Sequence, residues 1–279
     1  MPKQITFYLL IFPLILFNSC SDRHSQEVEN LRFPLQVGNI WEYKVNITEY
    51  YYSDTAGNIE YQDTIHLTGN LTLTVAEKSD RDSLKNVYRL VSKAEIFNSE
   101  HINTGYYKNL DDGLYLFEIY SLGINVLPKS TSKNDPLNKC NSIAGMLSNS
   151  LLFRNLNYGK LNDPDYPRKI LPYPIKLNRQ WTITDSDSLN IDKKIIGKDT
   201  INTKSGNFDC YVVEYLYDLD YDGEWDDEIS ILDYYSENGL ISRQIKLMEN
   251  VHATADNPEG IGFFDIEQVF MLTDYEIAD

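Results

Sequence analysis

The amino-acid sequence predicts a mostly β protein, an antiparallel arrangement of curved sheets or a half-barrel. Two observations lead to this fold class. Apolar and polar residues alternate with a period of two in several segments, which is typical of strands with one buried face. The 279-residue chain also contains 21 Tyr, a residue that is enriched in strands. With 42% hydrophobic residues, the chain is able to bury a sizeable core.

The first residues have the pattern of a bacterial export signal. Lys3 precedes an uninterrupted apolar run, Ile5 to Phe17, which is shorter than the roughly 20 residues that span a bilayer. Ser19 and Cys20 follow, and the chain then becomes polar. This arrangement resembles a bacterial lipoprotein signal, which implies removal of 1–19 and lipidation of Cys20. The alternative is an ordinary secreted protein in which Cys20 is incidental.

Residues 20–32 are polar without apolar periodicity, so they are expected to form a flexible tether. The tether would connect the lipid, as a membrane anchor, to the folded part. The formal net charge of −17 excludes nucleic acid as a partner, because phosphate groups would be repelled. We therefore expect a lipid-anchored protein of the cell envelope, outside the cytoplasm. The outer membrane is the expected membrane, and the face is left open.

The residues 33–120 are expected to form a first β module. In Asn39–Tyr52, the residues Trp41, Tyr43, Val45 and Ile47 alternate with polar ones. Two further alternating runs lie within Thr64–Val75, with Gly69 between them. The segments NVYRLVSKAEIF and GLYLFEIY are expected to be further strands.

The residues 121–172 differ in composition and are expected to form an irregular connector. They are rich in Asn, Ser, Lys and Pro. Apolar residues at helical spacing, among them Cys140, Leu147 and Leu151, indicate a short helix inside this connector.

The residues 173–279 are expected to form a second β module that echoes the first. FPLQVGNIWEYKV, starting at Phe33, is echoed by YPIKLNRQWTITD, starting at Tyr173. NVYRLVS is echoed by FDCYVVEY, and GYYKNLDDGLYLFEI by DYYSENGLISRQI, in the same order. A duplicated β module explains these echoes. The alternative is that strand starts and tyrosine-rich hairpins look alike in any β protein.

Three motifs resemble those of bacterial lipoproteins with an extracytoplasmic β-sheet domain, a family without an established function. They are the opening Pro34, Leu35, Gly38, Trp41 and Tyr43, the strand Gly206, Phe208 and Cys210, and the hairpin Tyr234, Tyr235, Gly239 and Leu240. The resemblance covers about 120 residues and implies an antiparallel, curved sheet outside the cytoplasm. It implies no activity.

The segment DLDYDGEWDDE, Asp218 to Glu228, contains seven carboxylates in eleven residues. Calcium prefers alternating oxygen ligands followed by Gly, and the candidate ligands here are Asp218, Asp220, Asp222, Glu224 and Asp226. The twelfth position of an EF-hand loop would be Ile229, and strands flank the segment, so it is not an EF-hand. The alternative is a solvated acidic hairpin, which Asp-Gly favours.

The remaining cysteines, Cys140 and Cys210, could form a disulfide in an oxidising compartment. The alternative is two unpaired thiols, because Cys210 occupies a position typical of a buried strand residue. No Cys/His cluster indicates zinc.

No catalytic motif is present, neither GxSxG, HExxH nor a phosphate-binding glycine loop. We therefore expect a binding or structural role in the envelope, with another envelope protein or a glycan as the partner. The alternative is a carrier that holds an apolar ligand such as lipid in a concave sheet. The third possibility is a hydrolase with an unrecognised acidic site.

Overall fold

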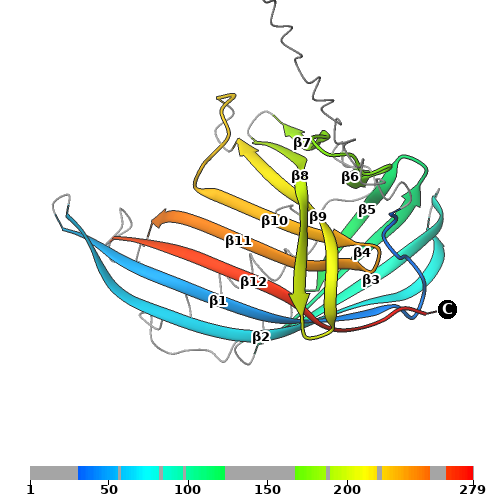
Figure 1. Ribbon diagram of the computed structural model, residues 1–279, viewed down its shortest axis with the longest axis horizontal. Coiled ribbons are helices and arrows are strands. Elements are labelled where there is room, and N and C mark those ends of the chain that lie inside the picture. Colours follow the sequence, from blue (N-terminus) through cyan, green and yellow to red (C-terminus); the bar gives the residue numbers. More distant parts are fainter. Residues whose placement is uncertain are drawn as a thin grey trace, which may run out of the picture.

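The computed structural model describes residues 31–55, 58–81, 84–96, 99–122, 167–186, 189–218, 222–251 and 262–278. These residues form twelve strands of one antiparallel sheet that curves into a nearly closed barrel (Figure 1). The predicted fold class, mostly β with curved antiparallel sheets, is confirmed. Within the described part of the chain, no helix is long and apolar enough to cross a bilayer.

The order of the strands across the sheet is β6-β5-β4-β3-β2-β1-β12-β11-β10-β9-β8-β7. The strands are β1 (Ile40–Thr55), β2 (Asn58–Arg81), β3 (Leu84–Ile96), β4 (Ser99–Leu110), β5 (Gly113–Leu122), β6 (Arg168–Pro172), β7 (Gln180–Ser186), β8 (Leu189–Thr203), β9 (Gly206–Asp218), β10 (Ile229–Ser236), β11 (Gly239–Val251) and β12 (Gly262–Glu276). Each half of the chain is therefore a six-stranded meander, and the first strand, β1, pairs with the last, β12.

The alternation read in the sequence places one face of β1 in the core. Trp41, Tyr43, Val45 and Ile47 are all at most 2% exposed. On β2 the two predicted alternating runs are one continuous strand that passes through Gly69. A Cβ at Gly69 would lie 2.6 Å from the backbone oxygen of the neighbouring strand β3. Glycine therefore permits close strand packing here rather than marking a break.

The same turn precedes the first strand of each half. Gly38 before β1 and Asn178 before β7 both have a positive φ, 99° and 62°. The Gly38 N–H donates to Val75 O at 2.9 Å, and the Asn178 N–H donates to Ile195 O at 2.7 Å. The sequence echo aligns these two turns, so their shared geometry agrees with the predicted duplication.

The barrel is closed across the seam between β6 and β7 by side chains. The two strands are the ends of the hydrogen-bonded order. The Trp181 indole N–H on β7 donates to Lys169 O on β6 at 2.9 Å. The Lys193 ammonium on β8 donates to Ile170 O on β6 at 3.3 Å. Side-chain donors thus satisfy carbonyl groups that the edge strand β6 would otherwise expose.

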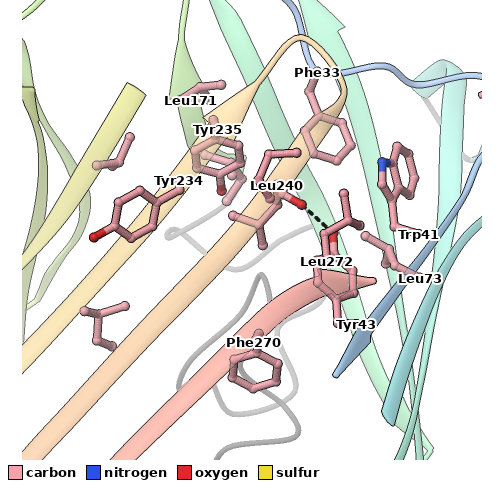
Figure 2. Close-up of a cluster of buried hydrophobic side chains, with 14 of the residues drawn as sticks. Phe33, Trp41, Tyr43, Leu73, Leu171, Tyr234, Tyr235, Leu240, Phe270 and Leu272 are labelled. Carbon is pink, nitrogen blue, oxygen red and sulfur yellow. Dashed lines mark hydrogen bonds between the residues drawn. The ribbon is translucent and has the colours of Figure 1, made fainter. Parts of the chain in front are cut away.

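Large aromatic side chains fill one end of the barrel, which we call the packed end and define by Phe33, Trp41, Tyr173 and Tyr235. The Phe33 ring lies 5.5 Å from the Trp41 ring and 6.5 Å from the Tyr235 ring. The Phe33 N–H donates to the Tyr173 hydroxyl at 2.8 Å. Figure 2 shows Phe33, Trp41 and Tyr235 of this cluster, together with the hydrogen bond that the Tyr43 hydroxyl donates to the backbone oxygen of Leu240.

The predicted segment boundaries differ from the structure at two points. The tether was expected to extend to Arg32, but Leu31 is buried in the core. The connector 121–172 was expected to be irregular, yet its last residues form β6, because the short apolar run in Arg168–Pro172 pairs with β5. The predicted short helix lies outside the described residues. The two predicted β modules, 33–120 and 173–279, are halves of one continuous sheet.

Candidate binding site

A pocket of about 580 Å³ lies between the β8–β9 hairpin and the turn that joins β10 to β11. We call it the hairpin pocket. Leu31, at the start of the folded chain, completes its wall. The residues that give it its chemical character are Lys198, Asp199, Asp209, Cys210, Tyr211 and Glu237. Its volume falls within the roughly 300–1,000 Å³ typical of small-molecule sites.

The local sequence explains why two hairpins meet here. Gly206 and Gly239 have a positive φ, 135° and 107°, which suits the tight turns of the β8–β9 and β10–β11 hairpins. Phe208, near the tip of the first hairpin, contacts the Tyr275 ring of β12 at 5.8 Å. This contact ties the hairpin to β12, and Figure 1 shows the tip of the hairpin crossing that end of β12.

Three carboxylates and one ammonium group line the hairpin pocket. Thr200 orients two of the carboxylates: its N–H donates to Asp199 Oδ1 at 2.8 Å and its hydroxyl donates to Asp209 Oδ1 at 2.9 Å. The third carboxylate, Glu237, is exposed on the β10–β11 turn. The ammonium group of Lys198 lies 4.6 Å from the centre of the Tyr211 ring. The charges at the pocket are therefore predominantly negative.

The Tyr211 side chain is buried, with 4% of its surface exposed. Its hydroxyl has no hydrogen-bond partner. Buried hydroxyl groups in proteins are almost always hydrogen-bonded to protein or to water, so this one has capacity for a partner. Tyr211 thus lines the pocket, while its hydroxyl is shielded from solvent.

The thiol of Cys210 is not a reactive group. It is buried in the pocket wall, and among the described residues it has no disulfide partner. Burial raises the pKa of this thiol to about 12, and the nearby Asp209 and Asp199 act in the same direction. Because the thiolate is the nucleophile, the raised pKa makes this thiol a poor nucleophile at neutral pH.

A buried ionic cluster lies further along the same strands. Asp233 on β10 and Arg243 on β11 are 0% and 2% exposed, and they form a bidentate ion pair. The hydroxyl groups of Tyr215 and Tyr235 donate to Asp233 Oδ2 at 2.8 and 3.1 Å. Burial raises the pKa of both tyrosines well above the ordinary value. The carboxylate is therefore fully hydrogen-bonded and out of reach of a ligand.

Lys193 joins this cluster to the seam of the barrel. Its ammonium group lies 4.0 Å from the centre of the Tyr215 ring and donates to Ile170 O. Burial lowers the pKa of Lys193 to about 7, although Asp233 opposes this shift. The side chain is 1% exposed, so its role is to hold β8 against β6 rather than to react.

The acidic segment forms a ten-residue loop between β9 and β10. Asp218 is buried, and its two carboxylate oxygens accept the backbone N–H groups of Asp222 and Gly223, each at 3.1 Å. Gly223 has φ of 90°, as the predicted turn requires. In the part of the chain that the structure describes, no three acidic, His or Cys side chains could hold a metal ion. Asp220 lies outside that part, so calcium binding by Asp218, Asp220, Asp222, Glu224 and Asp226 stays a prediction.

Two other predicted sites also fall outside the described residues. Cys140 does, so the predicted Cys140–Cys210 disulfide stays a prediction. Cys20 does too, so its lipidation rests on the sequence.

Comparisons with known proteins give only distant similarity. No family model matches the chain, and no curated protein sequence does. A candidate lipoprotein from Parabacteroides distasonis has a TM-score of 0.28 and 12% identity over 88% of this chain and 97% of its own. A candidate exported protein with a YmcC-like fold from Bacteroides fragilis has a TM-score of 0.28 and 11% identity over 88% and 98%. A β-barrel-like DUF1849 protein from Brucella abortus has a TM-score of 0.31 and 11% identity over 90% and 100%. Similarity at this level assigns the chain to no family.

The hairpin pocket and the ionic cluster were not found from the sequence. The pocket combines two hairpins with Leu31, and a local sequence pattern does not reveal that these distant segments come together. The ionic cluster is indicated indirectly by the sequence, because Asp233 and Arg243 occupy inward-facing positions of apolar strands. A charged residue at an inward-facing position indicates a buried partner, even though it does not identify that partner.

Proposed function

We propose that this protein is a lipid-anchored, non-catalytic binding protein of the bacterial cell envelope, and that it captures a small ligand in the hairpin pocket. The anchor is inferred from the apolar run that ends before Cys20. Ten residues, and so eleven Cα–Cα steps, separate Cys20 from Leu31, which contributes to the pocket wall. Since an extended chain spans at most about 3.6 Å per residue, the pocket lies within about 40 Å of the lipid.

The single observation that carries the binding role is the hairpin pocket itself. It has the volume of a small-molecule site, an aromatic wall and several polar groups, which is the usual composition of such sites. Its Cys210 thiol is held protonated, and the Asp233–Arg243 pair is sealed in the core. These features support binding without catalysis.

The alternative role, a carrier of an apolar ligand, needs an open apolar surface inside the curved sheet. At the packed end that surface is used for the protein's own packing. Trp41, Tyr43 and Phe270 are each at most 2% exposed there. The proposal therefore places the ligand in the hairpin pocket rather than against the concave face.

A thermal-shift screen of the full-length protein in detergent tests the binding role. The screen covers amines, carboxylates, phosphate and neutral sugars. Ligands that raise the melting temperature of the wild type should lose this effect in Asn207→Trp, because the new ring fills the pocket from its exposed rim. The matched control is Asn46→Trp, at an exposed position of β1. If Asn207→Trp responds to every ligand as the control does, the pocket is not the binding site.

The anchor is tested separately by mass spectrometry of the protein from bacterial membranes. We expect a mature chain that begins at a lipid-modified Cys20, and a Cys20→Ser variant that carries no lipid. An unmodified Cys20 in a protein that still begins at residue 20 would contradict the anchor.

A further inference from the structure

We propose that the packed end of the barrel rests on the membrane that holds the lipidated Cys20, with exposed aliphatic side chains in the boundary between headgroups and acyl chains. We call these side chains the apolar rim and define it by Val37, Leu177, Ile196 and Ile277. They are 37–47% exposed. The inference rests on the lipid anchor of the proposed function and goes beyond it, because it assigns a membrane-facing surface to the folded part.

The first pair of the apolar rim, Leu177 and Ile196, lies where the turn before β7 meets β8. The N–H of Asn178, next to Leu177, donates to the backbone oxygen of Ile195, next to Ile196, at 2.7 Å. Ile196 is the extra residue of a β-bulge in the β8–β9 pairing. The hydrogen bond and the bulge therefore bring two exposed aliphatic residues to one place on the surface.

The second pair, Val37 and Ile277, occupies the matching position in the other half of the chain. Val37 lies in the turn before β1, and Ile277 follows the end of β12. The N–H of Ala278, next to Ile277, donates to Asn39 Oδ1 at 2.8 Å. Single exposed aliphatic residues are ordinary on a protein surface, whereas groups of them mark sites of contact with proteins or membranes.

Both pairs lie at the packed end. Val37 follows Phe33 by four residues, and Leu177 follows Tyr173 by four residues. Phe33 and Tyr173 are hydrogen-bonded to each other at 2.8 Å. Since an extended chain spans at most about 3.6 Å per residue, Val37 and Leu177 each lie within about 15 Å of the packed-end residue that precedes them.

The tether to the lipid starts from the same end. Leu31 lines the hairpin pocket together with Lys198, which is two residues beyond Ile196. The ten residues between Cys20 and Leu31 reach at most about 40 Å. The 16-residue strand β1 runs about 50 Å away from the packed end, at about 3.3 Å per residue, so only a taut tether would let the opposite end face the membrane.

The contact with the membrane is apolar rather than electrostatic. The formal net charge of −17 means that anionic headgroups repel the protein, so charge does not draw this end to the bilayer. The apolar rim supplies the attraction, as the apolar face does in proteins that lie in the membrane interface. In this orientation the hairpin pocket, whose wall includes Leu31, lies beside the membrane surface.

The test is quenching of a fluorescent dye by brominated phosphatidylcholine. Full-length protein, purified from bacterial membranes with its lipid, is reconstituted into phosphatidylcholine vesicles, and flotation measures its attachment. The dye is placed on one introduced cysteine, Val37→Cys or Leu177→Cys, in a Cys140→Ser background. Cys210 is buried, and the background protein without an introduced cysteine is the blank.

The matched controls are Tyr61→Cys and Met248→Cys, which also replace exposed apolar residues. Tyr61 pairs with Tyr52 near the end of β1 that is remote from the packed end. Met248 is hydrogen-bonded to Glu228, just before β10 begins, whereas β10 ends at the packed end. Brominated lipid should quench the dye at the rim positions at least about twofold more than at the control positions, and high salt should leave this difference unchanged.

The other outcomes overturn the inference in distinguishable ways. Equal quenching at all four positions would mean that the barrel has no fixed orientation on the bilayer. Protein that floats with the vesicles but is quenched nowhere would stand clear of the membrane on its tether, and the anchor would remain. A blue-shifted dye at the rim without quenching by lipid would indicate contact with a second copy of the chain instead. Protein that does not float would overturn the anchor together with the inference, while the ligand screen would still decide the role of the pocket.

Discussion

Replacing Asp233 by Asn should be one of the most damaging single changes in the described part of the chain. Asp233 is fully buried and accepts hydrogen bonds from Arg243, Tyr215 and Tyr235. The variant keeps the shape of the side chain but leaves the Arg243 guanidinium buried without a counter-ion. Breaking a buried ion pair in this way costs about 3–5 kcal/mol. Since the free energy of unfolding of a typical protein is about 5–15 kcal/mol, the loss is a large fraction of the total.

Urea unfolding followed by circular dichroism measures this loss. The exposed Asp63→Asn variant makes the same chemical change and should stay within about 0.5 kcal/mol of the wild type. Combining Asp233→Asn with Arg243→Met removes both charges, so the double variant should be more stable than the Asp233→Asn single variant. A loss below about 1 kcal/mol in Asp233→Asn would show instead that Arg243 finds water or another partner in place of the carboxylate.

Three further predictions concern stability and reactivity. Burial lowers the pKa of Lys193 to about 7 in the folded protein, so between pH 7 and 9 the unfolded chain keeps a proton on Lys193 that the folded protein has lost. The free energy of unfolding should therefore rise with pH. The rise should reach up to about 1.4 kcal/mol per pH unit when the wild type is compared with Lys193→Met. Urea unfolding at several pH values measures this difference, and parallel pH curves for the two proteins would contradict it. Gly239→Ala places a Cβ 3.0 Å from Trp41 Nε1 at a residue with φ of 107°, so it should lower the free energy of unfolding by about 1–3 kcal/mol in the same assay. The control Gly197→Ala, where the added Cβ meets open space, should change the free energy of unfolding little. In reduced protein, Cys210 should react with a thiol reagent far more slowly in the folded state than in urea, because its pKa is raised to about 12; equal rates would contradict its burial.

Much of the fold follows from period-two patterns that are local in the sequence. The inward set of β1, from Trp41 to Ile47, was predicted from alternation, and the structure buries all of it. The β9–β10 pair has the same arrangement, since the register places the buried residues Tyr215 and Ile231 opposite each other. Local patterns succeed here because each strand has one face in the core.

Features that depend on distant contacts could not be predicted. The pairing of β1 with β12 joins residues more than 200 positions apart, and nothing in either strand specifies the partner. Gly69 was interpreted as a separator, since the sequence does not reveal how closely the next strand approaches. The strand β6 was missed because five residues beside prolines give too little alternation.

The candidate site was predicted least well. The acidic segment was predicted as a calcium site because its carboxylates lie close together in the sequence. In the structure, the Asp218 carboxylate accepts hydrogen bonds from the backbone of its own loop. The hairpin pocket draws on Lys198, Tyr211 and Glu237, which are ordinary residues in their local sequence. Its chemistry arises only when two hairpins and Leu31 come together.

The binding role rests on the hairpin pocket, so the ligand screen of the wild type and of Asn207→Trp, both full-length in detergent, is the measurement to make first. We expect at least one ligand to raise the melting temperature of the wild type and to leave that of the variant unchanged. Equal shifts in the two proteins, or no shift in either with any ligand, would mean that the pocket is not a binding site.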